Sequence, residues 1–287
     1  MRVAISFDYD SPAGYRESFG KKDYHPAADL EGTEALLKVL AAEDVKATFA
    51  VVGLVALPGE PPDHCPDQIR RLHAAGHEIA SHSMYHRFLP PMRSEQLFDD
   101  TKASKEALEA CIGKSIRGYI PPFNRPSHFP HKGAISFSEC FGLQGRGRGR
   151  QSIGTLLTTL QRLGFGWCRV SFRNTFRGIA DKLRMTNGYL PVPFLFHGLV
   201  AVPLHATGFG DTAVSLVRRY LDTDSLVVLY AHPNQALAHA TPNVESAELL
   251  GRFFATFERE RAHGKLTFET MAQVECTARQ RIGASQT

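Results

Sequence analysis

Short apolar segments alternate with longer amphipathic segments along this chain, and that alternation limits the folds that are open to it. Residues 3–7 have the pattern of a buried strand that ends in polar residues. Residues 32–43 then carry leucines at helical spacing, and a second apolar strand pattern follows at 46–52. Strands that alternate with helices predict βαβ units and a parallel sheet.

The same alternation continues to the C-terminus. We expect further strands at 76–81, 116–120, 166–171, 199–204, 226–230 and 265–268, with helices at 66–75, 94–111, 153–163, 212–220 and 244–261. About seven strands with intervening helices predict a closed or nearly closed α/β barrel. In such barrels the chemistry takes place at the carboxyl ends of the strands.

Residues 123–151 interrupt the pattern, because Pro, Gly, Ser and Arg displace the apolar periodicity there. We interpret this stretch as an irregular insertion within one domain of residues 1–287. Such a segment is either a substrate-binding loop or a merely mobile one. Its basic part, residues 144–150, is a solvated loop or a grip for an anion, and it has too few aromatic residues to predict nucleic-acid binding.

The cysteines and the lengths of the apolar runs give an expectation for the cellular compartment of the protein. Five cysteines are scattered without a C-x-x-C pair, which argues against a disulfide framework or a cysteine-ligated zinc site. The first residues have no secretory signal pattern, and no apolar run reaches the roughly eighteen residues of a membrane span. We therefore expect a cytoplasmic protein, either a monomer or a homo-oligomer.

Polar residues follow the predicted strands at the end where a barrel carries its chemistry. Asp8 and Asp10 follow the first strand, and His82 and His86 follow the third. One Asp and two His at i, i+4 spacing, on a turn of helix, are what a three-ligand catalytic metal site requires. Thirteen histidines will produce H-x-x-x-H by chance, so the signal becomes strong only through its pairing with Asp-x-Asp. Three more polar residues lie at or near later strand ends, namely Asn124, His205 and His232.

These motifs resemble those of the polysaccharide deacetylases, the NodB-like family also called carbohydrate esterase family 4. The family has an Asp-Asp motif after the first strand, H-[ST]-x-x-H after the third, R-P-P-Y-G after the fourth, and a leucine-rich strand that ends in histidine. This chain has Ser-Phe-Asp-Tyr-Asp at 6–10, His-Ser-Met-Tyr-His at 82–86, Ile-Pro-Pro-Phe-Asn at 120–124 and Leu-Val-Val-Leu-Tyr-Ala-His at 226–232, in that order. The resemblance implies a distorted (β/α)7 barrel of the NodB type.

The resemblance also implies a role for each residue. Asp10, His82 and His86 would hold one divalent metal ion, with zinc preferred and cobalt or nickel also chemically reasonable. Asp8 would be the general base and His232 the general acid.

Further residues would surround the substrate. The backbone N–H of Phe123, after Pro122, would help to form the oxyanion hole. Asn124, Arg125 and His205 are expected to border the substrate, although a structural role for His205 carries equal weight.

Two departures from the family pattern affect the choice of reaction. The first motif is Asp-x-Asp, and Ile120 replaces the arginine that is the usual charged partner of the base. Arg117 or Arg125 is expected to substitute for that arginine. The first hypothesis is an N-deacetylase that acts on an N-acetylated amino sugar or small glycoconjugate. The alternatives are a deformylase or a cyclic imide or allantoin-type amidohydrolase, and a catalytically silent binding member of the fold.

Overall fold

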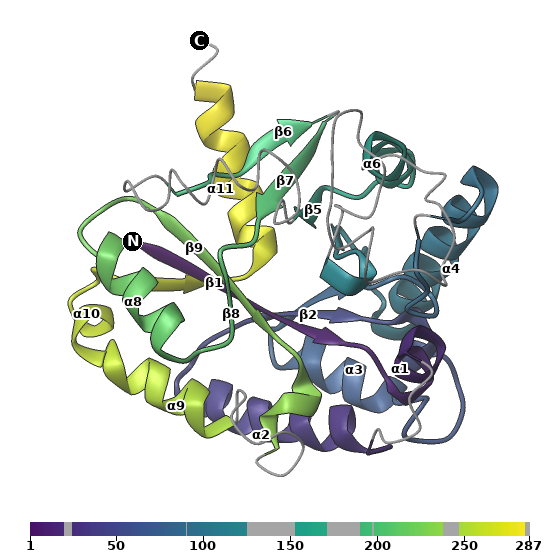
Figure 1. Ribbon diagram of the computed structural model, residues 1–287, viewed down its shortest axis with the longest axis horizontal. Helices are drawn as coiled ribbons and strands as arrows, with labels where there is room; N and C mark the ends of the chain where they lie inside the picture. The colour runs from purple at the N-terminus through teal and green to yellow at the C-terminus, as the bar shows by residue number, and fades with distance from the viewer. Residues whose placement is uncertain are drawn as a thin grey trace.

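One strongly curled sheet forms the centre of the fold, and helices cover its outer side (Figure 1). The computed structural model describes residues 1–19, 25–89, 91–124, 153–170, 190–196, 198–237 and 247–284. Within them the strands are β1 (Arg2–Tyr9), β2 (Thr48–Val51), β3 (Glu78–Ser81), β4 (Gly118–Tyr119), β5 (Trp167–Val170), β6 (Phe194–Phe196), β7 (Leu199–Pro203), β8 (Ala206–Thr207), β9 (Leu226–Ala231) and β10 (Thr267–Glu269). The α-helices are α1 (Pro12–Phe19), α2 (Ala28–Ala42), α3 (Pro66–Ala74), α4 (Ser94–Ile112), α6 (Ile153–Arg162), α8 (Asp211–Tyr220), α9 (Ala247–Thr256), α10 (Glu258–Ala262) and α11 (Met271–Ala284).

The order of the strands brings the predicted site together. Neighbouring strands follow the order β6-β7-β5-β4-β3-β2-β1-β9-β8, and β10 also pairs with β1. β1, β2, β3 and β9 run parallel to one another, so their carboxyl ends lie at one edge of the sheet. The predicted α/β class is confirmed, with the sheet forming an open half-barrel.

The two faces of the strands have different partners. Val3, Ile5 and Phe7 of β1 face outward and share one apolar cluster with the inner sides of α2 and α9. The inner face carries small residues, among them Ala4 of β1 and Ala50 of β2. This alternation follows from the two-residue period of a strand. In the described residues, no helix is both long enough and apolar enough to cross a membrane.

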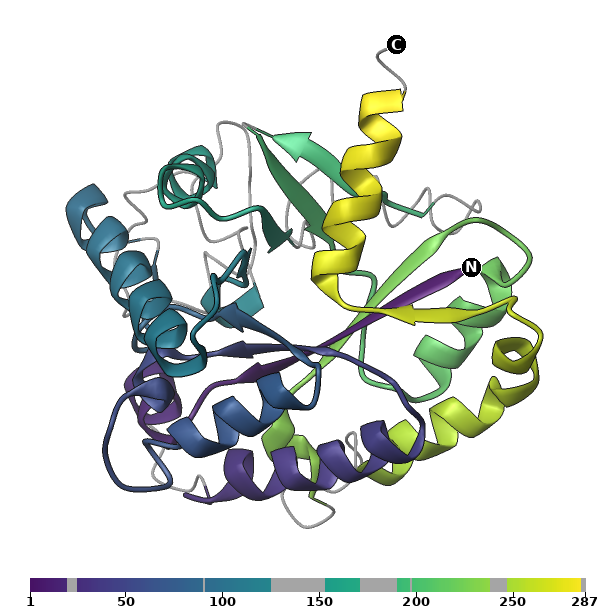
Figure 2. The ribbon, with the colours of Figure 1, turned by 180° about the vertical axis from the view of Figure 1, so that it is seen from behind.

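The C-terminal helix α11 fills the concave side of the sheet (Figure 2). Its residues Met271 and Val274 pack in the same cluster as Ala4, Ala50 and the ring of Trp167. Trp167, the only tryptophan in the sequence, is fully buried and belongs to the core. The inner alanines leave the space that this helix and this ring occupy.

Several elements differ from those expected. The helix expected at 244–261 is broken at Phe257, whose backbone leaves helical geometry while its ring packs on Phe253. Helix α1 was not predicted; Ser11 caps it by accepting the Gly14 N–H, and Pro12 occupies its first turn. The antiparallel strand β6 and helix α11 were not predicted. Most of the insertion at 123–151 lies outside the described residues.

A buried carboxylate joins α11 to the sheet. Glu78 of β3 accepts hydrogen bonds from the Thr48 hydroxyl at 2.7 Å, the Trp167 Nε1–H at 3.0 Å and the Ala272 N–H at 2.8 Å. The Thr48 Oγ1 in turn accepts the Met271 N–H at 2.9 Å. Two free N–H groups of the first turn of α11 are therefore satisfied from inside the sheet.

Replacing Glu78 by leucine should therefore lower the free energy of unfolding by at least about 3 kcal/mol, because three donors lose their acceptor and each stranded donor costs about 1–3 kcal/mol. Denaturant titration measures this. Glu248→Leu is the matched control, since Glu248 lies in an exposed ion pair with Arg252 and its loss should cost less than about 0.5 kcal/mol. Equal, small changes in the two variants would contradict the role given to Glu78.

Candidate metal centre

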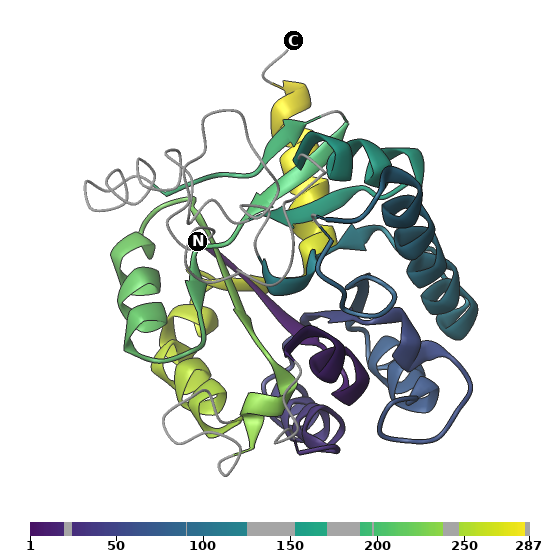
Figure 3. The ribbon, with the colours of Figure 1, turned by 45° about the vertical axis from the view of Figure 1, so that its right-hand side comes forward.

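Two strand ends supply the predicted metal ligands. Asp10 lies directly after β1, and His82 and His86 follow β3, with β2 between the two strands. β1, β2 and β3 are parallel neighbours, so these strand ends lie at the same edge of the sheet (Figure 3). The three side chains are almost completely buried, at 4% exposure for Asp10, 1% for His82 and 2% for His86.

The geometry of these three residues suits a divalent cation. The Nε2 atoms of His82 and His86 each lie 3.3 Å from Asp10 Oδ1, and one potential ligand atom from each residue lies within 4.8 Å of the others. Asp10 Oδ1 is buried and accepts no hydrogen bond. A buried carboxylate oxygen without a donor is costly unless a cation neutralises it, so the site fits a metal.

The orientation of His82 is fixed by its second ring nitrogen. Its Nδ1 lies 2.7 Å from the carbonyl oxygen of Ile120, so this nitrogen carries the proton and donates it. The Nε2 lone pair is then directed toward Asp10, as in metal-bound histidines whose other nitrogen is hydrogen-bonded. Ile120 thus contributes its backbone at the position where an arginine side chain was expected.

The segment that carries the two histidines is not a turn of helix, contrary to the sequence interpretation. Ser83 and His86 have φ of 65° and 55°, in the left-handed region that costs non-glycine residues energy. The surroundings stabilise this conformation, since Ser83 Oγ accepts the His86 N–H at 2.9 Å and Asp100 Oδ2 of α4 accepts the Met84 N–H at 3.0 Å. Both imidazoles therefore reach Asp10 from an irregular turn.

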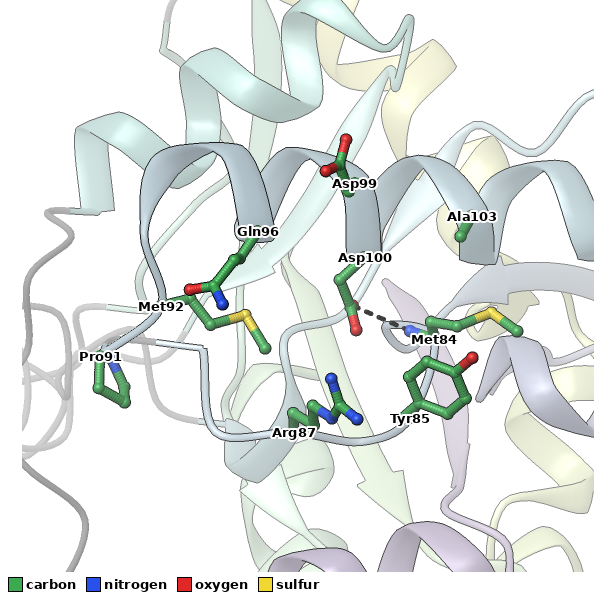
Figure 4. Close-up of a pocket in the computed structure, with 9 residues that line it drawn as sticks. All are labelled: Met84, Tyr85, Arg87, Pro91, Met92, Gln96, Asp99, Asp100 and Ala103. Carbon is green, nitrogen blue, oxygen red and sulfur yellow. Dashed lines mark hydrogen bonds between the residues drawn. The ribbon is translucent and has the colours of Figure 1, made fainter.

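A cavity of about 560 Å³ separates this turn from α4 (Figure 4). Asp100 forms part of its wall, and burial raises the pKa of that carboxyl to about 6. The cavity is lined by Met84, Tyr85, Arg87, Pro91, Met92, Gln96, Asp99, Asp100 and Ala103. Asp100 contacts the segment between the two histidines through the backbone N–H of Met84.

The surroundings of His86 and Asp10 shift their pKa values toward the protonation states in which these side chains bind a metal. Burial lowers the pKa of His86 to about 4, so its imidazole is neutral at pH 7. Burial alone would raise the pKa of Asp10, but His86, His232 and His82 outweigh it and hold that pKa well below its usual range. A neutral imidazole and an ionised carboxylate are the forms that bind a metal.

Asp8 has a cationic partner that the sequence did not reveal. The Asp8 Oδ2 accepts a hydrogen bond from Nη2 of Arg169, a residue of β5, in a fully buried ion pair. The expectation that Arg117 substitutes for the family arginine is wrong, because Arg117 pairs with Glu275 at 2.6 Å. The other candidate, Arg125, lies outside the described residues. The sequence contained one signal for this role, because Arg169 is a charged residue within the apolar strand pattern at 166–171.

His232 reaches the site from the opposite side. It follows β9, its Nε2 lies 3.9 Å from Asp10 Oδ2, and its Nδ1 donates to Gln235 Oε1 at 3.2 Å. The turn η4 (Pro233–Ala236) packs tightly on α2, where a Cβ added to Gly32 would lie 1.8 Å from the Pro233 carbonyl oxygen. Burial lowers the pKa of His232, but Asp10, Asp8 and Asp29 outweigh this and raise it above its ordinary value.

Phe123 has a left-handed backbone conformation, which is strained for a residue other than glycine. It lies in η2 (Pro122–Asn124) with a φ of 64°, and its ring centroid is 5.1 Å from that of His86. The backbone after Pro122 therefore borders the metal ligands. The side chain of Asn124 lies outside the described part of the structure.

His205 has a structural role, the alternative that was weighed equally. Its Nδ1 accepts the Val228 N–H at 2.8 Å, and its Nε2 donates to the Pro191 carbonyl oxygen at 2.8 Å. Both nitrogens are thus engaged with the backbone, and burial lowers the pKa of this imidazole to about 4. A neutral histidine whose two ring nitrogens both form hydrogen bonds to the backbone has no nitrogen left to contact a substrate.

Comparison with known proteins agrees with this geometry. The polysaccharide deacetylase family model matches residues 2–129. A peptidoglycan-N-acetylglucosamine deacetylase of Bacillus cereus is 31% identical over 91 residues, which cover 32% of this chain and 31% of that protein. A chitooligosaccharide deacetylase of Rhizobium leguminosarum bv. trifolii is 41% identical over 80 residues, 28% of this chain and 34% of the relative. The chain thus aligns with about a third of the length of each of these curated relatives.

Solved structures extend the likeness in fold to almost the whole chain. A crystal structure of a polysaccharide deacetylase-type protein from Mycobacterium smegmatis superposes with a TM-score of 0.65 at 20% identity, covering 98% of this chain and 90% of that one. A mutant of a carbohydrate esterase family 4 pseudoenzyme from Bacillus anthracis, with restored activity, gives a TM-score of 0.52 at 13% identity, covering 96% of this chain and 67% of the other. Residues 2–129 therefore match the polysaccharide deacetylase family in sequence, and the chain as a whole shares the fold of these solved structures.

Proposed function

We propose that this protein is a metal-dependent N-deacetylase that hydrolyses the acetamide of an N-acetylated amino sugar or a small glycoconjugate. The observation that carries the proposal is the buried group of Asp10, His82 and His86, with a second carboxylate and a histidine beside it. By name, one curated relative is a peptidoglycan-N-acetylglucosamine deacetylase and the other a chitooligosaccharide deacetylase, which supports an amino sugar as the substrate.

The three ligands leave room for a metal that also engages the reactants. Zinc is the proposed ion because one carboxylate and two imidazoles form a common ligand set for catalytic zinc, and cobalt or nickel would accept the same donors. When bound, such an ion supplies Lewis acidity toward the acetamide carbonyl and lowers the pKa of water.

Asp8 is the proposed general base. One of its oxygens, Oδ2, is bonded to Arg169, while the other, Oδ1, is buried without a hydrogen-bond donor. Oδ1 is therefore the atom that accepts the proton of the attacking water. The backbone N–H of Phe123 is the proposed donor to the oxygen of the tetrahedral intermediate.

His232 is the proposed general acid. Its Nδ1–H is held by Gln235, so Nε2, which faces Asp10, carries the transferable proton. That proton passes to the amine nitrogen as the C–N bond breaks, because an unprotonated amine is a poor leaving group. Nearby carboxylates raise the pKa of His232 above its ordinary value, which favours the protonated form that a general acid needs.

The alternative of a deformylase or a cyclic imide or allantoin-type amidohydrolase rests on one remaining observation. The Asp-x-Asp spacing of Asp8 and Asp10 departs from the adjacent aspartates of the family pattern. The second departure, Ile120, no longer favours it, since Arg169 provides the base with its cation.

A mass-spectrometric screen tests the proposal directly. N-acetylated sugars, nucleotide sugars, formylated sugars and cyclic imides are incubated with the protein and added Zn²⁺, Co²⁺ or Ni²⁺, and we expect loss of acetyl from an amino sugar. His82→Ala and His86→Ala should lose both bound metal and activity while keeping the fold, because ligands at the mouth contribute little to the core. His263→Ala, on the exposed surface, is the control. Hydrolysis of a cyclic imide alone would favour the alternative.

The two aspartates should separate in their effects on metal and on rate. Asp8→Asn should keep the metal but lower kcat by roughly a hundredfold or more, the usual scale for a lost general base. Asp10→Asn should weaken metal affinity, with activity partly restored by excess metal. Metal content by elemental analysis and kcat at saturating metal distinguish the variants, and the opposite pattern would reverse the two roles.

The alkaline limb of the pH profile of kcat should belong to His232. Activity needs the protonated imidazole, so it falls as pH rises through the pKa of His232, and a raised pKa moves that limb to higher pH. Asp29→Asn keeps an oxygen for the Asn234 N–H at 3.2 Å but removes one of the charges that raise this pKa. We therefore expect the limb to move to lower pH in Asp29→Asn, and an unmoved limb would contradict His232 as the acid.

A further inference from the structure

Arg169 crosses the inside of the half-barrel. It belongs to β5, which is separated from β1 in the sheet by β4, β3 and β2, yet its guanidinium contacts residues of β1 and β9. The side chain is 0% exposed. A fully buried arginine is rare, and its desolvation costs several kcal/mol unless partners compensate.

The partners of Arg169 hold its guanidinium in one place. Nη1 donates to Ser6 Oγ at 2.7 Å, Nη2 donates to Asp8 Oδ2, and Cζ lies 4.6 Å from the centroid of the Tyr230 ring. Ser6 Oγ is itself fixed, since it donates to the Leu229 carbonyl oxygen at 3.3 Å. Ser6 and Tyr230 are register partners on adjacent strands, so the anchor is built into the pairing of β1 with β9.

This anchor acts on one of two competing carboxylates. Asp8 and Asp10 are two residues apart, both are buried near the two histidines, and a carboxylate is a good ligand for a divalent cation. Among the described residues, the group with metal-ligand spacing contains Asp10 but not Asp8. The Oδ1 atom of each aspartate is buried without a hydrogen-bond donor, and the two residues differ in that Oδ2 of Asp8 is bonded to Arg169.

We propose that Arg169 is a positioning residue that keeps Asp8 out of the coordination shell of the metal, so that Asp10 alone supplies the carboxylate ligand. By holding Oδ2, Arg169 prevents the Asp8 carboxylate from turning toward the cation and filling the position that water needs. The inference rests on the proposed function for its kinetic consequence, but its effect on metal binding needs no substrate.

Arg169→Met tests this with Zn²⁺ alone. With the anchor removed, Asp8 becomes an additional ligand, so affinity for Zn²⁺ measured by competition with a chelator should rise by about tenfold or more, the scale on which partners of metal ligands act. In the same variant kcat should fall by roughly a hundredfold, the scale of a lost general base, with KM little changed. Co²⁺ loading provides a second readout, since its visible absorption should change to that of a site with one more oxygen ligand.

The double variant Arg169→Met/Asp8→Asn isolates the cause. It removes both charges of the buried pair, which avoids leaving Asp8 uncompensated should the single variant fail to fold. Its Zn²⁺ affinity and Co²⁺ spectrum should return to those of Asp8→Asn. Arg169→Lys keeps a charge near Asp8 and should restore part of kcat and lie between the wild type and Arg169→Met in Zn²⁺ affinity.

A purely structural arginine would behave differently. Zn²⁺ affinity would then fall together with thermal stability in Arg169→Met, or stay unchanged, and the double variant would differ from Asp8→Asn; either result overturns the proposal. Arg117→Met is the control, since it removes one arginine partner of a buried carboxylate outside the site, that of Glu275, which keeps its second partner Arg279. If Zn²⁺ affinity follows the expected pattern but no acetyl group is removed from any sugar, the proposed function fails while the role of Arg169 stands.

Discussion

The buried ion pair between Arg169 and Asp8 joins two strands that the sheet itself keeps apart. β5 and β1 can exchange a side-chain hydrogen bond only because the sheet curls and brings its inner faces together. The small inner residues Ala4 and Ala50 leave space inside this curl. The position of the Asp8 carboxylate thus depends on the curvature of the whole half-barrel, because a change in that curvature would move Arg169 relative to Asp8.

The histidine side of the site depends on a different support. His86 and Ser83 have left-handed backbone conformations, and Asp100 of α4 holds the intervening Met84 N–H. Such strain persists only where the surroundings impose it. α4 and the irregular turn therefore act together, and they preorganise both imidazoles before any metal is present.

Much of this arrangement could be predicted from the sequence, because strand and helix periodicity and the residues at strand ends are local signals. Asp8, Asp10, His82 and His86 were identified in this way, the family resemblance selected Asp10 as the ligand, and the structure brings Asp10 together with the two histidines. Arg169 could not be assigned a partner, since periodicity gives no curvature and so cannot say which distant strands face one another. The helical geometry expected for residues 82–86 was wrong because spacing alone does not report a left-handed backbone.

Asp8 and His82 are held by different groups, which explains why an arginine at another position in the sequence can pair with the same carboxylate. An arginine just before Pro121 would approach from β4, but here Ile120 uses its carbonyl oxygen to orient His82. That carbonyl is a backbone group, so it does not require a particular side chain at this position. The arginine that pairs with Asp8 can then lie at any inner-facing position that the curvature of the sheet brings within hydrogen-bonding distance of Asp8. Arg169 shares the inner face with Trp167, two residues earlier in β5, and the Ser6 hydroxyl and the Tyr230 ring are placed to receive it.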